Sequence, residues 1–131
     1  SLYGASMLVR REAFEDVGLR DEGFFHYWEK TEFCLRLRRK VWRHSAAPDS
    51  RILHKVGAST GQKNSILDRY FTASGLRILR LHSKAPALGM VLFLTARFAR
   101  RILRFQISRC RRVWEGIQDY RQTLPITPRI S

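Results

Sequence analysis

Apolar side chains recur at helical spacing through the second half of the chain, and this pattern constrains the fold most strongly. It predicts a helix over residues 66–83. From Pro86 to about Tyr120 it predicts one long helix or a broken pair. The clearest apolar stripe consists of Val91, Leu94, Phe98, Ile102 and Phe105. A stripe of this kind needs a covering surface, so the second half is predicted to be an amphipathic helical extension.

The same region carries most of the positive charge. The chain has 25 Lys and Arg against 11 Asp and Glu, a net charge of +14. Residues 1–65 hold 12 basic and 8 acidic side chains, whereas residues 66–131 hold 13 and 3. Two interpretations follow for residues 85–113. The helix lies on an anionic membrane surface, or it packs on the rest of the protein with a solvated arginine face. The arginines concerned are Arg97, Arg100, Arg101, Arg104, Arg111 and Arg112.

Composition narrows the class of protein. Apolar residues make up 44% of the 131 residues and charged residues 27%, as in a globular domain. Binding to nucleic acid is disfavoured, because no helix-turn-helix, zinc or RNA-recognition signature accompanies the charge. Cys34 and Cys110 are predicted to be reduced thiols of a cytosolic protein. The chain starts without Met, which is typical of a fragment, and its longest apolar run, residues 85–96, is too short for a transmembrane helix.

The first half reads as alternating short elements. Apolar or β-branched runs predict strands at residues 2–9, 41–46 and 51–56. Helical spacing predicts helices at residues 10–17 and 29–40. A polar, glycine-containing loop is expected to follow at residues 57–65.

Two carboxylates at the start of the second of these helices are candidates for catalysis. Glu29 and Glu32 lie three residues apart, near one helix face, with Asp21 and Glu22 upstream. A carboxylate held there suits a general base that accepts a proton from a substrate hydroxyl. The alternative is a structural role, in which the acids cap the helix and Glu32 pairs with Arg36.

Two other features are candidates for binding. His54 lies in a short apolar strand that ends at the glycine-containing loop, where its imidazole can serve as a metal ligand, although a partly buried structural histidine fits as well. The aromatic run at residues 24–28 can pack in a core or form a platform on which a sugar ring stacks. Within it, Tyr27 and Trp28 are the platform candidates.

The order of these segments resembles the acceptor-side half of family 2 glycosyltransferases, and most of all the rhamnosyltransferase-like bacterial enzymes of cell-surface polysaccharide synthesis. The resemblance covers residues 4–59 strongly and continues weakly to Tyr120. The segments that carry it are residues 4–14 (GASMLVRREAF), 17–19 (VGL), 21–22 (DE), 24–25 (FF), 27–38 (YWEKTEFCLRLR), 47–48 (AP) and 54–55 (HK).

The resemblance implies an α/β fold: a partial GT-A, Rossmann-like fold with short strands and an acceptor helix, followed by a mainly helical C-terminal extension. It implies two parts, an acceptor and metal part at residues 1–65 and the basic extension at 66–131. It also implies inverting transfer from a nucleotide-sugar donor to a glycan or lipid-linked acceptor, with a divalent cation, Mn²⁺ or Mg²⁺, as cofactor. The donor-binding half and its Asp-x-Asp motif are expected outside this chain, so the fragment alone is not expected to be active.

Matched by position, Glu29 and Glu32 correspond to the first and last acids of the family's Glu-Asp-x-Asp segment. Trp28 corresponds to an acceptor-lining aromatic, beside Tyr27, and His54 to the histidine that completes the metal site. Lys30 replaces the usual catalytic Asp, while Val41 replaces the usual Gly after the helix and Arg20 an apolar loop residue.

The prediction is therefore the acceptor-side part of a metal-dependent glycosyltransferase, cytoplasmic and peripheral at the inner face of the cell membrane. The alternative is a non-catalytic transferase remnant or a basic module that binds membranes or polyanions, and Lys30 favours the remnant.

Overall fold

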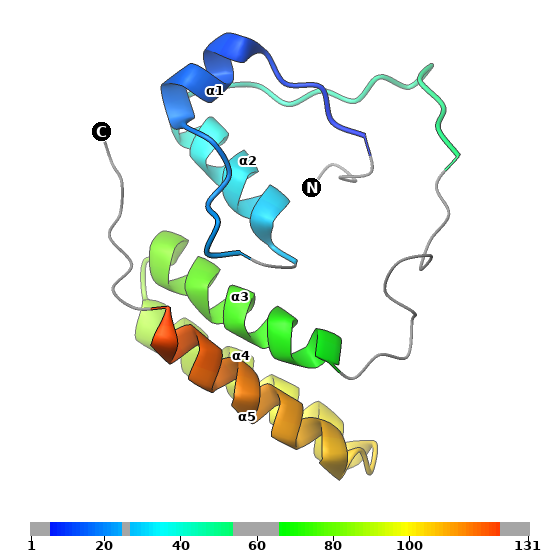
Figure 1. The fold of residues 1–131 in the computed structure, drawn as a ribbon, viewed down its shortest axis with the longest axis vertical. Helices are drawn as coiled ribbons and strands as arrows, with labels where there is room; N and C mark the ends of the chain where they lie inside the picture. The colour runs from blue at the N-terminus through cyan, green and yellow to red at the C-terminus, as the bar shows by residue number, and fades with distance from the viewer. Residues whose placement is uncertain (1–5, 25–26, 54–65, 124–131) are drawn as a thin grey trace. The chain divides into compact units, whose positions relative to one another are not determined.

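The computed structural model describes residues 6–24, 27–53 and 66–123, which contain five helices (Figure 1). The chain divides into two units. The first comprises residues 1–21 and 30–64, and the second residues 22–29 and 65–131. Segment 22–29 thus belongs with the C-terminal helices, although it precedes most of the first unit in sequence.

The first unit is built on two helices, α1 (Arg11–Val17) and α2 (Glu29–Arg39), the latter belonging to it from Lys30 onward. Ala13, Phe33 and Leu37 form its buried core. The rings of Phe14 and Phe33 stack with centroids 5.1 Å apart. Apolar residues at helical spacing in both helices therefore close a small core, as the sequence pattern predicts.

The end of α2 is closed by a Schellman motif without glycine. The Trp42 amide donates to the Leu37 carbonyl at 3.0 Å and the Val41 amide to the Arg38 carbonyl at 3.1 Å. Val41 takes the left-handed position with φ 64°, where glycine is usual because it has no Cβ to clash with the backbone.

The second unit contains α3 (Ile66–His82), α4 (Pro86–Leu103) and α5 (Ile107–Gln122). Helix α4 runs antiparallel to α3, and α5 reverses direction again (Figure 1). The long helical pattern is thus a broken pair. The buried apolar residues of the second unit are Phe24 in the segment before α2, Leu76 and Ile78 of α3, and Val113 and Tyr120 of α5.

Two glycines mark where these helices cross closely. A Cβ at Gly116 of α5 would lie 2.8 Å from the Thr72 Cβ of α3, with the Arg69 carbonyl closer still. A Cβ at Gly75 of α3 would lie 3.0 Å from Cε1 of Phe93 on α4. The absence of a side chain at each position lets the helix backbones approach.

The expected α/β fold is wrong for the described part of the chain. Helix accounts for 66% of these residues and no strand occurs among them. Residues 6–9, 41–46 and 51–53 are not strands, and the rest of the expected strands lie outside the described residues. The physical reason is visible at Leu8 and Leu53, which are fully exposed: an extended segment becomes a strand only when a neighbour completes its hydrogen-bond ladder.

The predicted orientation of the arginine face is also wrong in part. Arg97 and Arg101 of α4 point inward, each with a side chain only 15% exposed, and both form ion pairs with the buried Asp68 of α3. The expected stripe residues Val91, Ile102 and Phe105 are exposed instead. Burial lowers the pKa of Arg97, and the nearby Asp68 carboxylate opposes this shift. A buried acid on α3 therefore decides which side of α4 faces inward.

Among the described residues, no helix combines the length and the apolar character needed to cross a membrane.

Candidate functional site

Tyr27, Trp28 and Glu29 lead into α2 and belong to the second unit. Tyr27 and Trp28 both have φ 64°. This left-handed conformation disfavours side chains with a Cβ. Two consecutive bulky residues held this way must be fixed by their surroundings, and such strain is concentrated at functional sites.

The surroundings of these two residues are aromatic. The rings of Tyr27 and Trp28 lie 5.5 and 5.2 Å from the ring of Phe71 on α3. Phe71 in turn stacks on Phe93 of α4 at 6.2 Å. The Arg97 guanidinium lies 4.7 Å from the Phe71 centroid, within cation–π range. The predicted platform residues therefore sit on a supported aromatic cluster.

Two polar side-chain atoms at the start of α2 lack a hydrogen-bond partner among the described residues. Trp28 Nε1 and Glu29 Oε2 are enclosed, yet neither forms a hydrogen bond within the part of the chain that is described. A buried polar atom without a partner costs about 1–3 kcal/mol, and each such atom calls for an explanation. One is a donor and the other an acceptor, on adjacent residues at a helix start.

Glu32 is placed differently from Glu29. Its side chain is buried, and its two carboxylate oxygens accept hydrogen bonds from Arg36 Nε at 2.8 and 3.0 Å. Arg36 also donates to the Leu19 carbonyl at 2.8 Å and to the Val17 carbonyl. The pairing that the sequence offered as the structural alternative is therefore present, and it ties α2 to the end of α1.

The remaining predicted site residues do not form a metal centre in the described regions. His54 lies outside them. Within them, no group of three or more His, Cys, Asp or Glu side chains is placed to hold an ion. Lys30, at the position of the expected Asp, is half-buried in the first turn of α2. Both cysteines are free thiols, and burial raises the pKa of Cys34.

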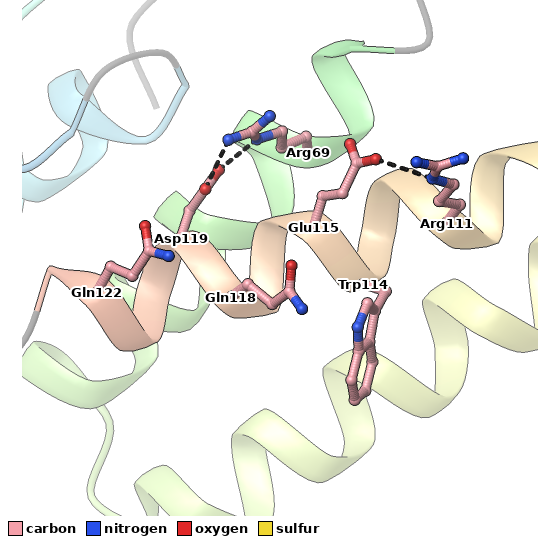
Figure 2. Close-up of a pocket in the computed structure, with 7 residues that line it drawn as sticks. All are labelled: Arg69, Arg111, Trp114, Glu115, Gln118, Asp119 and Gln122. Carbon is pink, nitrogen blue, oxygen red and sulfur yellow. Dashed lines mark hydrogen bonds and ion pairs between the residues drawn. The ribbon is translucent and has the colours of Figure 1, made fainter.

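A shallow groove of about 470 Å³ lies between α3 and α5 (Figure 2). Its charged groups pair with one another: Arg69 binds Asp119 at 2.6 and 2.8 Å, and Arg111 contacts Glu115 at 3.3 Å. The Asp119 hydrogen bond raises the pKa of Arg69. The remaining lining residues are Trp114, Gln118 and Gln122. Because its acids are committed to arginines, the groove offers no carboxylate for proton transfer.

Sequence reasoning missed Phe71, Phe93 and Asp68. The first two support the aromatic segment, and Asp68 orients α4. Phe71 is apolar at helical spacing in the printed sequence, but nothing there connects it to Tyr27, more than 40 residues away. The acid at position 68 stands out only because residues 69–114 contain no other acid.

Comparison with known proteins places part of the chain near sugar-transferring enzymes. It is 39% identical over 61 residues to an N-acetylglucosaminyl-diphospho-decaprenol L-rhamnosyltransferase of Mycobacterium tuberculosis, covering 47% of this chain. It is 42% identical over 38 residues to a low-salt glycan biosynthesis hexosyltransferase of Haloferax volcanii, covering 29% of this chain and 12% of that protein.

The chain spans about a fifth of the length of the mycobacterial relative, 20% by alignment. No family model and no solved structure matches it. Over part of its length, the chain is therefore related to glycosyltransferases.

Proposed function

We propose that this chain forms the acceptor-side part of an inverting glycosyltransferase that acts in cell-surface polysaccharide synthesis. The names of the partial relatives support sugar transfer. The donor would be a nucleotide-sugar and the acceptor a glycan or a lipid-linked saccharide. The donor-binding residues would come from outside this chain.

The observation that carries the proposal is the pair of unsatisfied atoms at Trp28 and Glu29. A sugar hydroxyl is both donor and acceptor. It can donate to Glu29 Oε2 while it accepts from Trp28 Nε1, which satisfies both atoms. The adjoining aromatic rings provide an apolar surface for a sugar ring. Because both atoms are enclosed in this conformation, the proposal requires a side-chain movement that opens the site to the hydroxyl.

In this proposal Glu29 is the general base. It takes the proton of the acceptor hydroxyl as that oxygen bonds to the anomeric carbon, and the bond from this carbon to the nucleoside diphosphate breaks. Attack from the face opposite the leaving group inverts the anomeric centre. Glu32 is a positioning residue, because its carboxylate is bound to Arg36.

A divalent cation, Mn²⁺ or Mg²⁺, remains the expected cofactor for the leaving diphosphate. The described residues do not form its site. His54, which lies outside them, is the ligand that the family resemblance suggests.

The test uses the full-length protein that contains this chain, a panel of nucleotide-sugars that includes a dTDP-deoxysugar, and an acceptor saccharide. Glu29→Gln should lower turnover by about 10²–10⁴-fold and leave donor affinity unchanged. Glu22→Gln, which changes an exposed acid nearby, is the matched control. Full activity of Glu29→Gln would contradict the base assignment. No turnover by an intact wild-type protein would favour the remnant, with Lys30 as the first suspect.

A further inference from the structure

Helix α4 presents an uncharged apolar face to solvent. None of its residues is buried. The large side chains of this face are each 60–79% exposed. We define the outer face of α4 as Leu88, Val91, Leu92, Thr95, Ala99, Ile102 and Leu103. At 1.5 Å rise per residue it extends over about 22 Å.

The outward orientation of this face is held by charge. Asp68 on α3 binds Arg97 at 2.8 Å and also pairs with Arg101 on the opposite side of α4 from the outer face. Rotating the helix to bury its leucines would leave the buried Asp68 carboxylate without these partners, which is strongly unfavourable. The ion pairs of Asp68 therefore keep the apolar face of α4 exposed.

The stretch of chain around α4 is rich in basic side chains, although several of them pair with acids. Residues 69–114 contain 11 Lys and Arg and no Asp or Glu. Lys84 precedes α4, Arg100 lies in its last turn and Arg104 caps its end, and all three are exposed. Glu115, the next acid along the chain, is engaged by Arg112 at 2.8 Å.

Phe105 extends the apolar surface at the turn between α4 and α5. It is 92% exposed and has φ 52°. The Gln106 amide donates to the Arg101 carbonyl at 2.9 Å and the Phe105 amide to the Ile102 carbonyl at 2.9 Å, so this is a second Schellman motif. A phenylalanine stands where glycine would relieve strain, and its ring projects into solvent. The stability of the fold therefore does not account for a phenylalanine at position 105.

We propose that the outer face of α4 and Phe105 dock on an anionic lipid surface, with the helix lying in the interface. Apolar side chains would enter the boundary between headgroups and acyl chains while Lys84 and Arg100, which flank this face, contact anionic headgroups. A second copy of the chain is a poorer occupant, because the two C-terminal halves, residues 66–131, would each bring +10. This inference goes beyond the proposed function and does not rest on it.

The experiment measures flotation of the full-length protein that contains this chain with vesicles of phosphatidylcholine alone and of phosphatidylcholine with 30% phosphatidylglycerol. We expect binding to the anionic vesicles that weakens as salt rises. Leu88→Ser with Leu92→Ser should weaken it by about tenfold or more. Lys84→Gln with Arg100→Gln should weaken it by about fivefold per charge removed. Leu53→Ser is the matched control, since Leu53 is a fully exposed leucine of the first unit.

Phe105→Gly separates docking from folding. It should raise the midpoint of thermal unfolding by relieving the left-handed strain, and at the same time reduce vesicle binding. Equal loss of binding in Leu53→Ser and in the α4 variants would overturn the proposal, as would absence of binding to anionic vesicles. A dimer in sedimentation that the Leu88 and Leu92 variant dissociates, without vesicle binding, would assign the face to self-association instead.

Discussion

At the scale of single residues, this chain holds side chains in backbone conformations that they disfavour. Tyr27, Trp28, Val41 and Phe105 all have φ between 52° and 64°. The first two precede the candidate base and the last projects from the proposed docking face. Val41 closes α2 and contacts no candidate site, so its strain offers a test of the local energetics alone.

Val41→Gly should stabilise the first unit by about 1 kcal/mol. A left-handed conformation costs a residue with a Cβ about 1–2 kcal/mol, and the larger entropy that glycine loses on folding offsets part of this gain. Urea denaturation measures this. Val41→Ala keeps the Cβ and should gain little. A glycine variant less stable than wild type would show that the side chain contributes more by packing than it loses to strain.

A second prediction at this scale concerns the loss of stability at low pH. The Trp42 indole, 2.9 Å from Asp16, and Lys40 lower the pKa of Asp16 below 3.8. The carboxylate is thus charged in the folded state at pH values where the unfolded chain takes up a proton. Its stabilising effect is complete above pH 3.8 and is lost as pH falls through the lowered pKa. Thermal melts between pH 5 and 2.5 should show this loss, and a smaller one in Asp16→Asn. Identical slopes in the two proteins would contradict it.

At the scale of elements, the joints between helices depend on a few specific contacts. Arg36 connects α2 to the carbonyls that follow α1, Asp68 connects α3 to α4, and Gly116 lets α5 approach α3. Each of these contacts joins residues far apart in sequence. Because each depends on one side chain or one glycine, a single substitution can test it.

Glu32→Gln should destabilise the first unit by about 1–3 kcal/mol, because Arg36 loses its charged partner in a largely buried setting. Glu29→Gln should leave stability nearly unchanged, since Glu29 Oε2 has no partner among the described residues. Chemical denaturation of the two variants provides the comparison. Equal losses in both would remove the distinction between a positioning acid and a catalytic one.

Gly116→Ala should destabilise the second unit by about 1–3 kcal/mol, because the new methyl meets the backbone carbonyl of Arg69, which cannot move aside cheaply. Gly89→Ala is the matched control in α4: its Cβ would meet the flexible Leu79 side chain at 3.3 Å. The control should be neutral or stabilising, since alanine favours helix by about 1 kcal/mol. Thermal unfolding measures both, and a stable Gly116→Ala would show that α5 shifts freely on α3.

At the scale of the whole molecule, the proposed activity needs groups from beyond the described residues. No group of His, Cys, Asp or Glu among the described residues is placed to hold the cation, and the related proteins are aligned over only a short part of their length. We expect turnover by the full-length protein to require Mn²⁺ or Mg²⁺. His54→Ala should raise the cation concentration needed for half-maximal rate. An unchanged requirement in that variant would remove His54 from the metal site.

The sequence alone predicted those features that depend on residues close together in the chain, and missed those that depend on tertiary contacts. Helical spacing placed α1, α2 and α3 to within a residue or two, and the i, i+4 relation anticipated the Glu32–Arg36 pair. The resemblance led to the glycosyltransferase relationship that the partial relatives support. The enclosed atoms at Trp28 and Glu29 had no sequence signal, because enclosure depends on tertiary contacts such as that of Trp28 with Phe71.

The sequence by itself determined where α1, α2 and α3 lie, because helix periodicity acts over a few residues, but it left open whether residues 86–120 form one helix or two. Only the tertiary structure decided which side of α4 faces inward, since that choice depends on Asp68, some 30 residues away. It also decided that extended segments in the described chain form no sheet, because a strand requires a neighbour whose position no local pattern specifies. Local hydrogen bonds determine which segments become helices. Burial of charge and contacts between distant segments determine which face of a helix is buried and whether extended segments pair.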